Sequence, residues 1–180
     1  MTIYHCQNDI KISSLIMTLL ETINLLNWIA KNQPNVNGIV ESGDIFDLNK
    51  DEYQQKYSAF CVTQNTHNVG EEFTTYSFTL FYVDRLTLDK SNKLEIQSTA
   101  VQFFGNLIKT IMQKFDSLNW TNGDVTTFTE KFSAECAGAY MTCSITSPNN
   151  SLCAIIQREL GEFAPKEYSD DWFKWVERYI

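Results

Sequence analysis

The stretch EFTTYSFTLFYVD, residues 72–84, decides the fold because its side chains alternate in chemical character. One set of alternate positions is aromatic or apolar and the other is mostly hydroxyl-bearing: Tyr76, Phe78, Leu80 and Tyr82 against Thr75, Ser77, Thr79 and Phe81. Successive side chains of a β-strand point to opposite faces of a sheet. The pattern therefore predicts a long strand with one apolar face and one hydroxyl-rich face.

Further strand-like segments accompany this one. Residues 57–63 precede it and are joined to it by the turn-like residues 65–70, which indicates two antiparallel neighbours. Residues 125–132 and 137–147 follow, after an expected turn at residues 119–124. The last segment again alternates apolar and polar side chains: Ala139, Met141, Cys143 and Ile145 against Tyr140, Thr142, Ser144 and Thr146. The connector at residues 35–51 either forms a short first strand or is held down by its apolar residues.

Two long helices are predicted from apolar residues at steps of three and four. The first runs from Asp9, an expected N-cap, to the region of Pro34, which ends it. The second follows the turn at residues 89–92 and runs to about Phe115. Gly105 is expected to let this helix pack closely against the sheet or the first helix. The predicted apolar stripe of the second helix consists of Leu94, Gln97, Val101, Phe104, Ile108, Ile111 and Phe115.

This order of elements predicts an α+β fold, in which one mostly antiparallel sheet carries two long helices on one face. Residues 1–148 are expected to form this domain, and the hydroxyl-rich sheet face is left to meet solvent or another subunit. Residues 149–180 are expected to form a C-terminal arm. Its end, residues 169–180, is predicted to be a short aromatic helix capped by Ser169.

Composition narrows the classes of function. The 180 residues include 22 acidic and 14 basic side chains, a net charge of −8, which disfavours nucleic acid or an anionic membrane as an electrostatic partner. Residues 10–30 are apolar but contain Lys11, Glu21 and several hydroxyl and amide groups, so we interpret them as a core helix and not as a membrane span. No phosphate-binding loop or nucleophile motif occurs in the sequence, and no catalytic residue or cofactor is predicted.

Metal chemistry has little support in the sequence. The five cysteines are widely spaced and include no C-x-x-C pair, so reduced thiols are expected: Cys6, Cys61, Cys136, Cys143 and Cys153. His5 stands beside Cys6, but two adjacent ligands are weak grounds for a metal site, and none is predicted. His67 lies in a polar turn, where a solvated loop residue is the simplest interpretation.

Asp84, Arg85 and Glu95 flank the turn between the long strand and the second helix. The two carboxylates are candidates for acid–base work or cation binding. Alternatively, Arg85 bridges Asp84 and Glu95, which fixes the turn and contributes to a subunit contact. The structural interpretation is favoured because no histidine or second acidic cluster joins these residues in the sequence.

Four short segments resemble a known group of proteins: residues 82–86 (YVDRL), 92–98 (NKLEIQS), 128–132 (FTEKF) and 136–140 (CAGAY). They look like segments that recur in ring proteins of crAss-like phages infecting Bacteroidetes. The order of elements is also similar to that of tail-terminator and tail-completion proteins of tailed bacteriophages. The likeness covers roughly residues 10–147 and includes no catalytic motif.

The resemblance implies a non-enzymatic structural virion protein of the neck or tail, assembled in the host cytoplasm as a head–tail connector or tail terminator. The implied assembly is a homo-oligomeric ring, twelvefold or sixfold. The implied partners are copies of itself and the adjoining portal, neck and tail proteins, with no membrane partner. Viral DNA is expected to pass through without specific binding. A negative lumen would repel its phosphates, although a net charge of −8 is also a common solubility feature.

Subunit contacts are hypothesised at two places, the strand-to-helix turn and the aromatic arm: Asp84, Arg85 and Glu95, and Trp172, Phe173 and Trp175. The arm residues either anchor a neighbouring subunit or fold back onto their own domain. Two other classes of function stay open. One is a small monomeric α+β enzyme or ligand-binding domain that uses the hydroxyl-rich sheet face. The other is a cytoplasmic adaptor that binds a partner through its aromatic arm.

Overall fold

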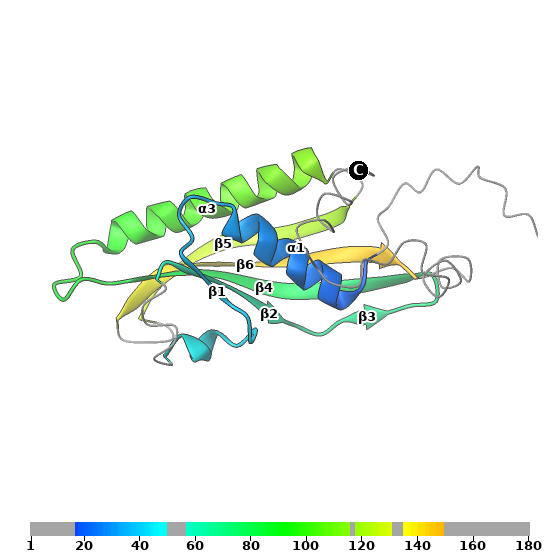
Figure 1. Cartoon of the computed structure of the whole chain (residues 1–180), viewed down its shortest axis with the longest axis horizontal. Coiled ribbons are helices and arrows are strands. Elements are labelled where there is room, and N and C mark those ends of the chain that lie inside the picture. Colours follow the sequence, from blue (N-terminus) through cyan, green and yellow to red (C-terminus); the bar gives the residue numbers. More distant parts are fainter. Residues whose placement is uncertain (1–16, 50–56, 116–117, 131–134, 150–180) are drawn as a thin grey trace, which may run out of the picture.

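The computed structural model describes residues 17–49, 57–115, 118–130 and 135–149 (Figure 1). Two helices, a short 3-10 helix and the strands follow one another in the order that is expected of an α+β chain. Their bounds are α1 Leu19–Lys31, β1 Gly38–Val40, η1 Ile45–Asn49, β2 Ala59–Gln64, β3 Asn68–Val69, β4 Phe73–Arg85, α3 Lys93–Lys114, β5 Asn119–Thr129 and β6 Cys136–Pro148.

Within the described residues, six strands form one mixed and mostly antiparallel sheet in the order β1-β2-β4-β6-β5, with β3 also paired to β4. The two longest strands, β4 and β6, pair from Phe73 opposite Pro148 to Arg85 opposite Cys136. Only the pair of β1 and β2 is parallel among these described strands. The predicted α+β class is therefore confirmed.

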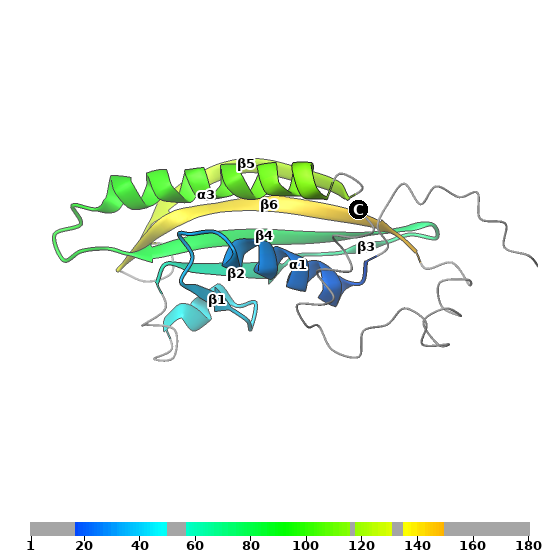
Figure 2. The same ribbon diagram turned by 45° about the horizontal axis from the view of Figure 1, so that its top comes forward.

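Both helices lie on the same face of the sheet (Figures 1 and 2). The ring of Tyr82 in β4 lies 5.0 Å from that of Phe103 in α3, and Phe103 lies 5.5 Å from Phe60 in β2, measured between ring centroids. The predicted division of β4 and β6 into two faces is confirmed, because the apolar set of each strand packs under the helices and only Tyr76 of these residues is partly exposed. The sheet contributes Phe60, Val62, Phe78, Leu80, Tyr82, Ala139, Met141, Cys143 and Ile145 to this core.

The opposite face of the sheet carries a second apolar cluster at one end. Cys61, Phe81 and Val83 are buried there together with Val40 and Ile45 of the connector between α1 and β2. The connector therefore forms a short strand, β1, and its apolar residues also pack against the sheet. Both of the alternatives that the sequence left open for this segment are thus correct.

The first helix begins later than the sequence predicts. Thr18 has extended backbone (φ −80°, ψ 165°), and its hydroxyl accepts a hydrogen bond from the Glu21 N–H while the Glu21 carboxylate accepts one from the Thr18 N–H. This reciprocal capping box fixes the helix start at Leu19. A helix of 13 residues is about 20 Å long. The expected N-cap at Asp9 lies outside the described residues, and a helix continuous from it through Thr18 is wrong.

The second helix is placed correctly along the chain, but its buried face is rotated from the predicted one. Leu94 and Val101 are exposed, although Phe104 and Ile111 of the predicted stripe are buried. Gly105 is exposed, and a Cβ built there would meet no atom within 4 Å, so the expected close packing at Gly105 is wrong. The buried residues are Ile96, Ala100, Phe103, Phe104, Leu107 and Ile111.

Residues 119–124 are part of a strand and not a turn. β5 starts at Asn119, and its register with β6 shifts between Asn122 and Val125. The Asn-Gly sequence at residues 122–123 is thus accommodated as a β-bulge, which is common in edge strands. Phe132 and the expected C-terminal arm lie outside the described residues.

Candidate functional site

A broad uncharged surface lies on the sheet face opposite α1 and α3. The registers place hydroxyl side chains of two adjacent strands side by side, because Thr75, Ser77 and Thr79 of β4 stand opposite Thr146, Ser144 and Thr142 of β6. On the far side of β6, Thr121 of β5 stands opposite Ser144. On the far side of β4, Thr63 of β2 stands opposite Thr79. We call this surface the hydroxyl face: Thr63, Thr75, Ser77, Thr79, Thr121, Thr142, Ser144 and Thr146.

Several hydroxyl groups of this surface bond to each other across strands. The Thr75 and Thr146 hydroxyl oxygens are 2.9 Å apart, and those of Thr121 and Ser144 are 2.7 Å apart. The Thr79 hydroxyl exchanges two hydrogen bonds with the Asn65 amide, at 3.0 and 3.2 Å. Because these polar groups already have partners, covering the surface leaves few of them unsatisfied. These paired hydroxyl groups can therefore be covered at low cost.

A groove of about 320 Å³ lies within this surface. The side chains that line it come from the loop after β2 and from β4, β5 and β6, and none of them is charged. Hydroxyl and amide groups of this kind can donate and accept hydrogen bonds, but they supply no acid or base of matched pKa. The lining residues are Asn65, Ser77, Thr121, Asn122, Gly123, Thr142, Cys143 and Ser144.

The charged residues at the strand-to-helix turn do not form the predicted bridge. The Arg85 guanidinium pairs with Glu135, at 2.9 Å, and not with Asp84 or Glu95. Both side chains of the pair are more than half exposed, so the pair stabilises the fold by at most about 1 kcal/mol. The sequence did not indicate this partner, because Glu135 becomes a neighbour only when β6 pairs with β4.

Asp84 is half-buried, and its carboxylate accepts a hydrogen bond from the Arg85 N–H at 2.7 Å. Burial raises the pKa of the Asp84 carboxyl, the hydrogen bond from Arg85 lowers it, and the nearby Glu95 carboxylate raises it. Asp84 and Glu95 are thus near each other, as the sequence predicts. The arrangement leaves Asp84 at the end of β4 and Glu95 in the exposed first turn of α3.

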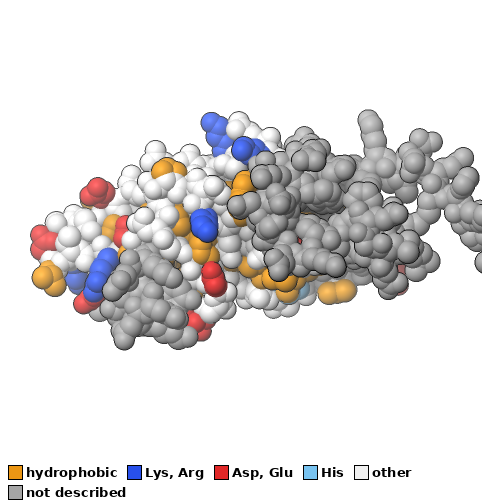
Figure 3. All heavy atoms as spheres, in the orientation of Figure 1, with side chains coloured by type: hydrophobic (Ala, Val, Ile, Leu, Met, Phe, Trp, Pro, Cys, Tyr) orange, Lys and Arg blue, Asp and Glu red, His pale blue; other side chains and the backbone are white. Residues whose placement is uncertain are grey.

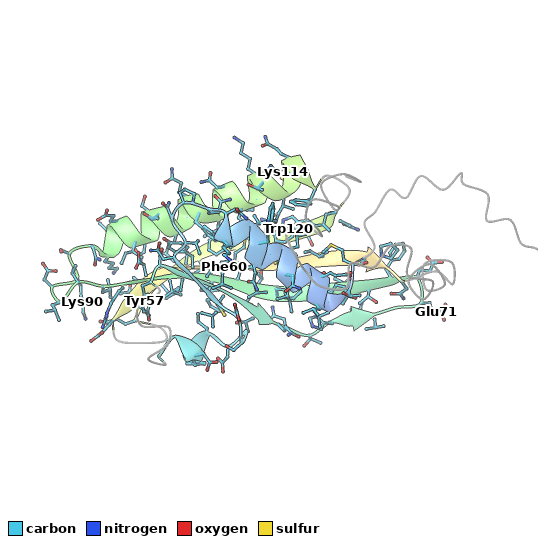
Figure 4. The ribbon with its side chains drawn as sticks, in the orientation of Figure 1. Tyr57, Phe60, Glu71, Lys90, Lys114 and Trp120 are labelled. Atoms are coloured by element: carbon cyan, nitrogen blue, oxygen red, sulfur yellow. The ribbon has the colours of Figure 1, made fainter. Side chains whose placement is uncertain are left out.

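Asn92 fixes the loop between β4 and α3. Its side-chain oxygen accepts a hydrogen bond from the Thr87 N–H at 3.0 Å, and its amide donates to the Arg85 carbonyl at 3.0 Å. Asn92 occupies the N-cap position of α3 without a side-chain capping bond. Lys90 of this loop forms an ion pair with Glu130. Figure 4 shows Lys90 and Glu71 at opposite ends of the sheet.

His67 is not the solvated loop residue that the sequence suggests. It is half-buried, and its Nδ1 atom accepts a hydrogen bond from the Ser77 N–H at 3.2 Å. Its ring lies edge-on to that of Tyr76, with 5.8 Å between the centroids. His67 therefore ties the loop after β2 to β4.

The described cysteines are buried: Cys61, Cys136 and Cys143. Burial raises the pKa of the Cys61 thiol to about 11 and raises that of Cys143 further. Among the residues the structure describes, no three His, Cys, Asp or Glu side chains come together as potential metal ligands. Cys6, Cys153 and His5 lie outside the described residues.

The other predicted contact residues, Trp172, Phe173 and Trp175, also lie outside the described residues.

Neither of the described helices has the length and apolar character needed to cross a membrane. Comparison with known protein families and with curated proteins finds no match for this chain.

Proposed function

We propose that the chain is a structural protein that assembles with copies of itself into a ring in the neck or tail of a tailed phage. The observation that carries the proposal is the hydroxyl face, a broad uncharged surface opposite the helices of the fold. The choice of a phage ring protein as the class rests on a resemblance. The order of elements and the segments at residues 82–86 and 92–98 are similar to those of phage ring proteins.

The chemistry of the hydroxyl face suits a protein interface. The centre of an interface is depleted of charged side chains and packs as tightly as a protein interior. Lys, Arg, Asp, Glu and His are all missing from β2 and β6, and in β4 the acidic and basic residues are Asp84 and Arg85 at its end. A neighbouring protein can therefore cover β2, β4 and β6 without burying an unpaired charge, provided that the exposed Asp124 of the edge strand β5 stays at the rim of the contact.

Self-association in one direction leads to a ring. When two different patches of identical copies meet head to tail, each copy has one patch left to bind another, and the contact repeats until rotation closes it. A ring of this kind would surround a channel, in which the acidic side chains that give the net charge of −8 would repel passing DNA.

The test is the mass of the purified chain in solution, measured by light scattering from micromolar concentration to its solubility limit. We expect a single species with a fixed number of copies, and negative-stain images should show rings. A chain that stays monomeric over the whole range would contradict the proposal. Deleting residues 169–180 tests the aromatic arm separately, and unchanged assembly would exclude Trp172, Phe173 and Trp175 as ring anchors.

The groove on the hydroxyl face favours one other function, a monomeric domain that binds a neutral ligand. Its lining offers hydroxyl and amide groups from four segments of the chain, which is suitable for uncharged hydrogen-bonding molecules. The light-scattering measurement distinguishes the two functions. A ring protein is expected to have the mass of several copies, whereas a ligand-binding domain is expected to have the mass of one.

A further inference from the structure

α3 presents an exposed apolar stripe, formed by Leu94, Val101, Gly105 and Met112. The exposed fractions of the three larger side chains are 76% for Leu94, 45% for Val101 and 67% for Met112. At 3.6 residues per turn these four positions fall within an arc of about 40°. A Cβ at Gly105 would have no neighbouring atom within 4 Å, so the stripe is open at its middle. We call these four residues the α3 stripe.

The charges of α3 lie toward its ends. Between Glu95 and Lys109 the helix carries no ionisable side chain. Figure 3 shows charged side chains near both ends of α3, with hydrophobic and uncharged atoms between them. A surface helix normally has a charged or polar outer face. The α3 stripe thus has the composition of a buried contact, although it is exposed in the single chain.

The α3 stripe and the hydroxyl face lie on different sides of the molecule. α3 packs on the sheet through its buried residues, such as Phe103 and Leu107, whereas the hydroxyl side chains point away from it. Every copy carries a net charge of −8, so copies repel one another, and facing surfaces that lack charge add no contact between like charges. These two surfaces lack charge, and one chain supplies both.

We infer that the α3 stripe of one copy packs on the hydroxyl face of the next copy. The inference rests on the ring function proposed above and names the two surfaces that form the ring contact. The sheet would then lie between its own helices and the α3 of a neighbour, which is the layered packing of helices on both faces of a sheet. The contact joins two different patches, so it runs head to tail.

The hydroxyl face is shorter than the helix, so one neighbour would cover it with part of the α3 stripe. α3 has 22 residues and is about 33 Å long, whereas Thr75 to Thr79 of β4 extend about 13 Å. Beyond them the same sheet face is occupied by the second apolar cluster around Phe81 and Val83. Leu94, Val101 and Met112 supply protruding side chains, and the threonines of the hydroxyl face offer methyl groups between their paired hydroxyls.

Two variants block one surface each. Gly105→Arg places a long charged side chain in the α3 stripe, and Thr142→Arg places one in the hydroxyl face, where Thr142 is exposed. The matched controls are Gln113→Arg, on α3 outside the stripe, and Thr127→Arg, which is exposed on the other face of the sheet. Thermal unfolding followed by circular dichroism verifies that all four fold, and light scattering gives their masses.

We expect each blocking variant to weaken self-association more than about tenfold, because an unpaired charge would be buried in the contact. The controls should assemble as the unmodified chain does. The decisive sample is an equimolar mixture of Gly105→Arg and Thr142→Arg. The first retains its hydroxyl face and the second its α3 stripe, so the mixture should form a dimer that contains one copy of each and grows no further.

Other outcomes overturn the inference in distinguishable ways. If both blocking variants assemble normally, the ring contact lies elsewhere and the proposed function is unaffected. If Thr142→Arg alone still forms dimers, the α3 stripe pairs with itself about a two-fold axis and the head-to-tail contact is wrong. If the unmodified chain is monomeric up to its solubility limit, the proposed function fails and the inference fails with it.

Discussion

The backbone of Gly138 lies directly against the backbone of Tyr82, so that a Cβ at position 138 would be 1.9 Å from the Tyr82 carbonyl oxygen. The two residues belong to β6 and β4, the central pair of the sheet, where Gly138 stands opposite Val83. Tyr82 is itself fully buried, and its hydroxyl donates a hydrogen bond to the Asn35 carbonyl at 2.9 Å.

Replacing Gly138 with alanine should therefore destabilise the chain strongly. The atoms that a methyl group would meet belong to the backbone of a central strand, which cannot move aside as a flexible side chain could. Forced packing of this kind typically costs 1–3 kcal/mol, and we expect about 3 kcal/mol in a urea unfolding experiment at low protein concentration. A loss below about 1 kcal/mol would show that the two strands separate more easily than this contact implies.

Gly105→Ala should have the opposite effect. Gly105 lies in the middle of α3 with no atom within 4 Å of the added methyl group. Alanine loses less conformational entropy than glycine in a helix, so we expect the free energy of unfolding to rise by about 1 kcal/mol. The same urea titration measures it, and Gly138→Ala is the matched comparison. A destabilised Gly105→Ala variant would contradict the open surroundings of this position.

Thr18→Ala should remove the capping box of α1. The alanine cannot accept the hydrogen bond from the Glu21 N–H, and we expect a loss of about 1 kcal/mol in the free energy of unfolding. Thr18→Ser retains the hydroxyl and should lose much less, which separates capping from packing. Equal losses for the two variants would mean that the threonine methyl group, and not the cap, stabilises this end of the helix.

The buried thiols predict a loss of stability in alkali. Folding raises the pKa of Cys61 from its ordinary value of 9.0 to about 11, so the native state retains a proton that the unfolded chain releases above pH 9. Stability is therefore greatest below pH 9 and falls as the pH rises toward 11, by about 1.4 kcal/mol per pH unit for each such thiol. Burial raises the pKa of Cys143 as well, so this thiol contributes in the same direction.

Urea unfolding at pH 8 and pH 10 under reducing conditions measures this effect. The Cys61→Ala variant should lose about 1 kcal/mol less than the unmodified chain between the two pH values. The neighbouring Val62→Ala variant, which removes buried apolar atoms but no thiol, should show the same pH dependence as the unmodified chain. A pH dependence unchanged by Cys61→Ala would mean that water reaches this thiol in the native state.

Most of the fold prediction came from the alternation of apolar and polar side chains along the strands. Over most of β4 and β6 the period of two holds, so Phe78, Leu80, Met141 and Ile145 could be assigned to the core from sequence alone. The hydroxyl face follows from the same alternation. Its extent was underestimated, because Asn122 and Gly123 predicted a turn where β5 contains a bulge, and Thr121 was thereby left out of the sheet.

The helix errors have another cause. α3 is apolar on more than one side, so the period of 3.6 residues alone cannot decide which side faces the sheet, and exposed Leu94 and Val101 were taken for core residues. In the first helix the apolar pattern continues upstream of Thr18, and the Thr18–Glu21 capping box was overlooked. The Arg85–Glu135 pair spans 50 residues and depends on strand register, which local patterns do not report.

The pairing of β4 with β6 also determines when the domain can be completed. The partners are separated along the chain by α3 and β5, so the middle of the sheet is missing until residue 148 has left the ribosome. Before that moment β4 has one long edge uncovered, and an early stop in translation would release a chain with that edge open to aggregation. Among the described strands, the one that closes the centre of the sheet is therefore the last to be made.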